Sequence, residues 1–175
     1  NEDVFLSLDD RITIATQSGA DLFISLHADA VIEGEASGTT IYLLSENATD
    51  KMSAQLAARH DRSKILRDVD LSGLDSQIAS VLIDIARQET KPRNEAVASS
   101  ILEVFEERIT ELSTQPLRYA AFSVLKSPDI PSILIEAGFM STSSNLQNLI
   151  QPKWRAEFAD ALSEAILRWK LKDKQ

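Results

Sequence analysis

Cysteine is absent from all 175 residues of the sequence. Its absence excludes disulfide frameworks, cysteine-based zinc fingers, iron–sulfur sites and thiol nucleophiles. Glycine and proline number five each, too few for a collagen-like or low-complexity chain. No apolar run approaches the roughly 18 residues that a membrane helix needs. The nearest candidate, residues 130–139, is interrupted by Pro131, Ser132 and Glu136, so we expect no membrane span.

Basic side chains are scarce relative to acidic ones. The 18 Lys and Arg residues stand against 27 Asp and Glu residues, which gives a formal net charge of −9. Nucleic-acid binders normally present a basic surface, so nucleic acid is not expected as a partner. Hydrophobic residues make up 43% of the chain and charged residues 26%, values typical of one globular domain with a real core.

Apolar periodicity predicts helices that alternate with strands. Short apolar runs predict strands at residues 21–27, 39–45, 119–125 and 132–136. Helical spacing of apolar residues predicts helices at 6–18, from 49 to about 61, and at 75–89, 94–112 and 154–171. This alternation indicates an α/β protein with a layered sheet.

Two candidate catalytic side chains each close a predicted strand. His27 ends the first strand, where an imidazole can bind a metal or act as a general base. A hydrogen-bonded core histidine is the alternative. Glu136 ends the last strand, and a buried carboxylate is costly unless it is paired, metal-bound or catalytic. Its structural alternative is an ion pair with Lys126 or Arg118.

The two strand ends would meet if their strands are neighbours that run in the same direction. His27 and Glu136 would then form a zinc-hydrolase arrangement, with a histidine ligand beside a carboxylate that takes a proton from water. The second histidine, His60, lies in a polar helical stretch and is expected to be solvated.

Two long blocks of sequence carry a family resemblance. The first is Ala-Asp-Leu-Phe-Ile-Ser-Leu-His-Ala-Asp-Ala at residues 20–30, followed by Gly-Thr-Thr-Ile-Tyr-Leu-Leu-Ser at residues 38–45. The second is Val-Leu-Lys-Ser-Pro-Asp-Ile-Pro-Ser-Ile-Leu-Ile-Glu-Ala-Gly-Phe at residues 124–139. The opening stretch, 3–11, also fits. The chain resembles the zinc-dependent N-acetylmuramoyl-L-alanine amidases of bacterial cell-wall turnover.

The resemblance implies a fold, a cofactor and a reaction. The fold would be α/β, with a mixed, mostly parallel sheet flanked by helices on both faces. Residues 1–175 would form the amidase catalytic domain, with Zn²⁺ as cofactor, His27 as a zinc ligand and Glu136 as the catalytic carboxylate. The substrate would be peptidoglycan or a muropeptide, cut at the amide between N-acetylmuramic acid and L-alanine. The location would be the periplasm of a Gram-negative bacterium.

The metal site implied by the resemblance is incomplete in this sequence. The family's zinc ligands are two His and one Glu, and the first His and the Glu belong to a Gly-rich region at the start of the domain. Nothing here matches that region, so we expect these ligands before Asn1 and a domain that lacks its N-terminal part. Catalytic zinc is held by about three protein ligands, so His27 alone would not hold it. The alternative function is therefore a non-catalytic cell-wall binding or scaffolding domain with an incomplete metal site.

An inserted segment, residues 64–92, resembles the regulatory helix of amidases from Gram-negative division systems. In those proteins the helix covers the active site until an activator protein displaces it. Helical spacing places Asp75 and Glu89 on the apolar face of the predicted helix. We expect Glu89, or else Asp75, to block the zinc. The alternative is that Asp75 is a helix N-cap and Glu89 a solvated helix end.

Overall fold

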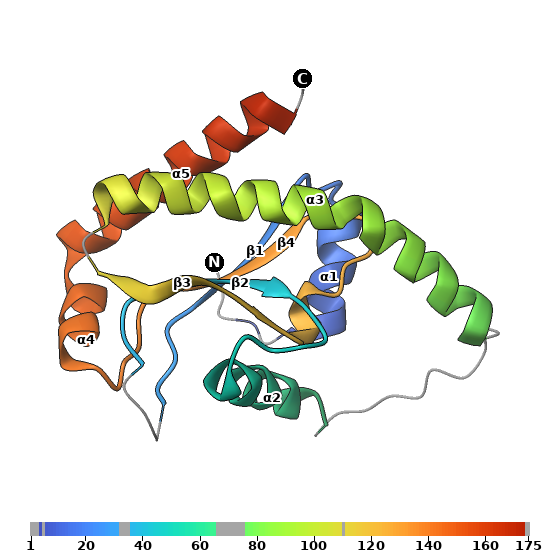
Figure 1. Ribbon diagram of the computed structural model, residues 1–175, viewed down its shortest axis with the longest axis horizontal. Helices are drawn as coiled ribbons and strands as arrows, with labels where there is room; N and C mark the ends of the chain where they lie inside the picture. Colours follow the sequence, from blue (N-terminus) through green and yellow to red (C-terminus); the bar gives the residue numbers. More distant parts are fainter. Residues whose placement is uncertain (1–3, 5, 32–35, 66–75, 110, 174–175) are drawn as a thin grey trace.

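A computed structural model describes Val4 and residues 6–31, 36–65, 76–109 and 111–173 (Figure 1). The elements in chain order are α1 (Leu8–Gln17), β1 (Phe23–His27), β2 (Thr39–Leu44), α2 (Lys51–Ile65), α3 (Ser76–Arg108), β3 (Leu112–Ala120), a short 3₁₀ helix η1 (Ser123–Leu125), β4 (Ser132–Glu136), α4 (Ser143–Ile150) and α5 (Pro152–Asp173). Within the described ranges, no helix combines the length and the apolar character needed to cross a membrane.

The sheet has four strands in the order β1-β4-β2-β3. β1 pairs with β4 in parallel, β2 pairs with β3 in parallel, and β2 pairs with β4 in antiparallel fashion. The sheet is therefore mixed and mostly parallel, as predicted. The predicted strands at 21–27, 39–45 and 132–136 correspond to β1, β2 and β4.

Helices cover both faces of this sheet (Figure 1). Because successive strand residues point to opposite faces, Ile133 and Ile135 of β4 pack against α3 and α5, whereas Leu134 packs toward α1 and α2. The α3–α5 side is the larger core. It is centred on Val97, Ile101 and Phe105 of α3 and Phe158 and Trp169 of α5.

The prediction of separate helices at 75–89 and 94–112 was wrong, because one continuous helix, α3, spans Ser76–Arg108. Pro92 lies inside it and removes one backbone hydrogen-bond donor. Tertiary contacts beside Pro92 hold the helix together. Arg93 makes a two-pronged ion pair with Asp173 of α5, with its Nη2 2.7 Å from Oδ2, and lies over the ring of Trp169. Pro92 predicts a helix end from the local sequence, but the helix continues through it where it packs against α5.

The strand predicted at 119–125 was misplaced. β3 begins at Leu112 and ends at Ala120, and residues 123–125 form η1 instead. β3 is an edge strand, so Pro116 costs no hydrogen bond that a central strand would need. Its half-exposed, polar-rich sequence lacks the apolar run that marks buried strands. The helix α4, only eight residues long, was also not predicted from the sequence.

A buried amide ties α4 to the sheet. Asn145 is 3% exposed, and its side-chain oxygen accepts hydrogen bonds from the backbone N–H groups of Gly38 and Phe139 at 2.9 and 3.1 Å. Gly38 has φ +82°, and a Cβ there would lie 2.5 Å from the backbone of Leu112. Only glycine fits this close approach. These contacts fix the segment that follows Glu136.

Candidate active site

The two strand-end residues lie next to each other. β1 and β4 are parallel neighbours in register, and His27 pairs directly with Glu136 at their carboxyl ends. The sequence analysis required these two strands to be neighbours that run in the same direction, and they are. Both side chains point to the α2 side of the sheet, because they occupy the same pleat positions as Ser25 and Leu134. Ligand sites of α/β proteins are built at such strand ends.

Glu136 is completely buried, and only one of its oxygens has a partner. The backbone N–H of Asp29 donates to Oε2 at 3.1 Å, while no donor among the described residues reaches Oε1. Burial, and then the nearby carboxylate of Asp29, raise the pKa of Glu136 to about 8. An unpaired buried acceptor costs about 1–3 kcal/mol. Arg118, proposed as an ion-pair partner for Glu136, instead binds Asp50 at 2.6 Å.

His27 is half-buried beside this carboxylate. Its Nε2 lies 2.8 Å from the hydroxyl of Ser25, two residues earlier on the same face of β1. Burial, and then the neighbouring His60, lower the pKa of His27 to about 4. The ring is therefore neutral at pH 7. A neutral imidazole with one nitrogen held by a hydrogen bond is the usual state of a metal-ligating histidine.

His60 was predicted to be solvated, and that prediction was wrong. Its side chain is only 13% exposed, and its Nε2 lies 2.6 Å from Oδ2 of Asp29. The His27 and His60 rings meet edge to face at 4.3 Å between centroids, and Phe122 flanks His60 at 5.4 Å. A sequence signal did exist. Residues four apart share a helix face, and His60 follows the buried Leu56 of α2 by four positions.

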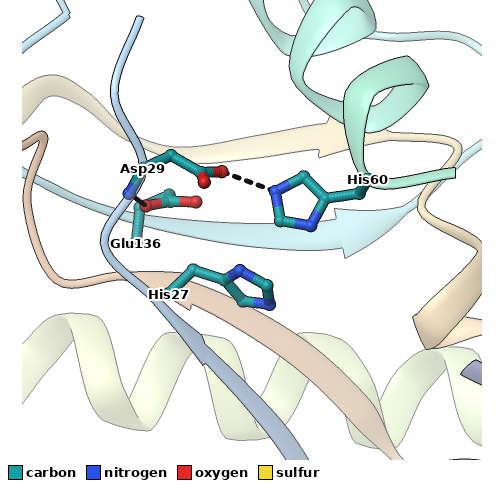
Figure 2. Close-up of side chains that lie close together, drawn as sticks. All are labelled: His27, Asp29, His60 and Glu136. Atoms are coloured by element: carbon teal, nitrogen blue, oxygen red, sulfur yellow. Dashed lines mark hydrogen bonds and ion pairs between the residues drawn. The ribbon is translucent and has the colours of Figure 1, made fainter. Parts of the chain in front are cut away.

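His27, Asp29, His60 and Glu136 thus form one cluster at the end of β1 and β4, below α2 (Figure 2). Each offers one nitrogen or oxygen atom, and these atoms lie within 4.8 Å of one another. The hydrogen bond from His60 is the largest cause that lowers the pKa of Asp29, and burial opposes it. Two imidazoles beside two carboxylates form a donor set suited to a divalent metal ion. The unpaired Oε1 of Glu136 points to the same conclusion.

The two residues expected to regulate the site are not part of this cluster. Glu89 lies on α3 with an exposed side chain. Asp75 lies outside the described residues, as does the segment 66–75 of the predicted insertion. The regulatory assignment therefore stays a prediction.

Comparison with known proteins finds relatives of this sequence. A family model described as N-acetylmuramoyl-L-alanine amidase matches residues 1–168. The N-acetylmuramoyl-L-alanine amidase AmiA of Escherichia coli is 31% identical over 168 residues, which cover 95% of this chain and 58% of AmiA. The chain thus spans little more than half the length of this relative.

Solved structures share the fold at lower identity. AmiC2, an N-acetylmuramoyl-L-alanine amidase of Nostoc punctiforme, superposes with a TM-score of 0.58 at 22% identity, covering 97% of this chain and 68% of AmiC2. The CwlD amidase of Clostridioides difficile, solved in complex with the GerS lipoprotein, gives a TM-score of 0.58 at 18% identity. That match covers 93% of this chain and 60% of CwlD. These likenesses show the fold.

Proposed function

The chain belongs to the N-acetylmuramoyl-L-alanine amidase family, and we propose that it is a metal-dependent hydrolase of peptidoglycan. The bond cut is the amide between the lactyl group of N-acetylmuramic acid and L-alanine of the stem peptide. One observation carries the proposal. The family-matching strand β4 ends in a fully buried carboxylate, Glu136, with a free oxygen beside the imidazole of His27. Peptidoglycan lies outside the inner membrane, so the proposed place of action is the periplasm.

The residues present fit a zinc ion. The donor set contains imidazole and carboxylate groups, and the buried Oε1 of Glu136 has no partner within the described structure. We assign His27 as a ligand, through the ring nitrogen that Ser25 does not occupy. When bound, Zn²⁺ supplies a Lewis acid that polarises an amide carbonyl and acidifies water.

Glu136 moves the proton in the proposed reaction. Its Oε2 is held by the N–H of Asp29, so Oε1 is the atom left to accept a proton from the attacking water. The water oxygen bonds to the lactyl carbonyl carbon. As the C–N bond breaks, Glu136 returns the proton to the leaving nitrogen of L-alanine.

Product analysis tests this function. Zinc-loaded protein incubated with purified muropeptides should release stem peptides that begin with a free L-alanine amine, detected by mass spectrometry. Glu136→Gln should abolish release, whereas Glu95→Gln, an exposed change on α3, should leave it intact. Muropeptides that bind and stay uncut would instead support the binding or scaffolding function.

Autoinhibition is a second part of the proposal. Glu89 lies on α3 within the predicted insertion 64–92, and its carboxylate is exposed and accessible. We assign it the role of covering the metal, with a protein activator that removes it. The CwlD amidase was solved with a lipoprotein partner, which supports a protein activator for this chain too.

A matched pair of substitutions tests the regulatory role. Glu89→Gln should raise basal amidase activity without an activator, because it removes the blocking charge. Glu95→Gln changes a similarly exposed carboxylate on the same helix and should have no effect. Equal activity of the two variants would contradict autoinhibition by Glu89.

A further inference from the structure

The segment that follows β1 is held from two sides. Nε2 of His60, on α2, lies 2.6 Å from Oδ2 of Asp29. The preceding residue of the helix, Arg59, donates from Nη1 to the backbone carbonyl of Ala30. From the loop after β4, the backbone N–H of Met140 donates to the carbonyl of Asp29 at 2.7 Å. Adjacent residues of one helix therefore bind adjacent residues of this segment.

The same segment holds the carboxylate of Glu136. The backbone N–H of Asp29 donates to Oε2 of Glu136 at 3.1 Å, whereas Oε1 has no partner within the described structure. Because one oxygen is fixed in this way, the position of the Asp29 N–H determines where the other oxygen faces. A shift of a reacting group by about 1 Å can lower a rate by about 100-fold. The contacts that fix Asp29 therefore bear on the chemistry of Glu136.

We infer that His60 is a positioning residue for Glu136, with Arg59 as its neighbouring support. His60 fixes the side chain of Asp29, and Asp29 fixes Oε2 of Glu136 through its backbone. The inference rests on the proposed function, because it names what orients the proton-transferring group of that site. It assigns His60 no bond to the metal and none to the substrate.

Packing gives His60 a fixed place from which to hold the segment. Leu56 and Ala57, which are buried, attach α2 to the sheet, and Phe122 meets the His60 ring at 5.4 Å between centroids. The His60 side chain is only 13% exposed. A hydrogen bond to a carboxylate in such a shielded place is stronger than one in water. Figure 2 shows His60 reaching from α2 to Asp29.

Hydrogen exchange of the Asp29 amide tests the inference without any catalysis. In metal-free protein with a chelator present, this N–H is bonded to Glu136 and should exchange slowly. His60→Leu keeps an apolar side chain but removes the hydrogen-bond donor. It should speed exchange of the Asp29 amide by about tenfold, the factor that corresponds to one hydrogen bond to a charged group. The amide of Ala137, bonded to a β1 carbonyl at 2.9 Å, should keep its wild-type rate.

Two results of this experiment would overturn the inference. One is an Asp29 amide that exchanges at the wild-type rate in the folded His60→Leu protein. The other is an equal acceleration at Asp29 and Ala137, because it would report loosening of the whole strand end rather than loss of one contact.

A conservative variant separates hydrogen bonding from packing. His60→Gln retains an N–H donor toward Asp29 and should restore slow exchange. Equal exchange in the Gln and Leu variants would assign the effect to the packing of the ring and overturn the inference. Asp29→Ala removes the acceptor instead and keeps the backbone N–H. Its amide should lose protection as in His60→Leu, and full protection there would also overturn the inference.

Kinetics of the zinc-loaded protein on muropeptides give a second readout. His60→Leu should lower kcat by about 10–100-fold with KM close to wild type, because Glu136 is misplaced while substrate contacts remain. His60→Gln should recover most of kcat. Gln55→Ala, on the exposed face of α2, is the control and should match wild type. A raised KM with unchanged kcat would place His60 in substrate binding and overturn the inference.

The two readouts separate this inference from the proposed function. Muropeptide cleavage by wild type with unchanged Asp29 exchange in His60→Leu would reject the positioning role and leave the amidase function standing. Faster Asp29 exchange in His60→Leu, rescued by His60→Gln, without muropeptide cleavage by wild type would reject the function and retain His60 as the residue that positions Glu136.

Discussion

The two faces of β4 differ in what they bury. Toward α3 and α5, Ile133 and Ile135 pack into an apolar core in which both are 0% exposed. Toward α2, the same strand ends in Glu136, equally buried but with one oxygen unpaired in the described structure. Side chains alternate between the two faces of β4. One face therefore stabilises the fold, and the other bears the free-energy cost of burying an unpaired polar atom.

Under the proposed function, the group that carries this cost is the one that performs the chemistry. Nearly all buried polar groups in native proteins have a hydrogen-bond partner, so an orphaned carboxylate oxygen requires a reason. Glu136 stands beside His27, His60 and Asp29, which together offer donors for a metal. Apolar burial on the α3–α5 face stabilises the fold and offsets this cost.

The largest expected effect is the loss of amidase activity when a residue on the α2 face of β4 is changed. Glu136→Gln should lower amidase kcat/KM by about 10²–10⁴-fold, the usual contribution of a positioned acid–base group. The fold should survive, because the amide occupies the same space. Muropeptide kinetics and a thermal unfolding curve check both statements. Wild-type activity in the Gln variant would remove Glu136 from the mechanism.

The next largest effect is the loss of stability when a residue on the α3–α5 face of β4 is changed. Ile133→Ala should lower the free energy of unfolding by about 2–5 kcal/mol, because it opens a cavity in the α3–α5 core. Activity per folded molecule should stay close to wild type. Denaturant unfolding and kinetics at low temperature measure the two quantities. A large loss of activity with little loss of stability would break the proposed division between the faces.

A smaller effect is expected from pH in metal-free protein. Glu136 has a pKa of about 8 when folded, above its ordinary value of 4.5, so the folded state holds a proton that the unfolded chain has released. Stability should fall by about 1–2 kcal/mol as pH rises from 6.5 to 8. The lowered pKa of His27, about 4, affects stability mainly below pH 6.5, the ordinary value for histidine.

Denaturant unfolding in the presence of a chelator, at pH 6.5 and at pH 8, measures this slope. Glu136→Gln cannot titrate and should be close to flat over the same window, and it should be more stable than wild type at pH 8. An equal slope in the two proteins would assign the pH dependence to another group.

The smallest expected effect concerns a polar contact within the apolar face. The hydroxyl of Ser100 on α3 donates to the carbonyl of Ala165 on α5 at 2.9 Å in a buried setting. Ser100→Ala should cost about 0.5–1.5 kcal/mol, the net value of one neutral hydrogen bond. Calorimetry measures it. A cost above that of Ile133→Ala would show that polar contacts, rather than packing, dominate this face.

The sequence predicted the strands that carry the site because their signals are local. The apolar runs that end in His27 and Glu136 each predicted a buried strand, and both strands formed where expected. Burial was correct for β4 only, because β1 lies at one end of the described sheet and is partly exposed. Pairing between them was a condition that the sequence left open. The bounds of the long helix α3 and the edge strand β3 were predicted wrongly. Pro92 and Pro116 interrupt the local helix and strand patterns, but both elements continue through them in the folded protein.

By itself, the sequence determined the two family blocks, the strand-ending His27 and Glu136, and the acidic, cysteine-free composition. Only the tertiary structure decided that His60 belongs with them. A helix pattern indicates which side of α2 is buried, but it does not state which strand end that side covers. The answer depends on how α2 packs against a sheet assembled from strands more than ninety residues apart in the chain, Ser132–Glu136 beside Phe23–His27. Long-range packing, rather than local propensity, therefore completes the cluster.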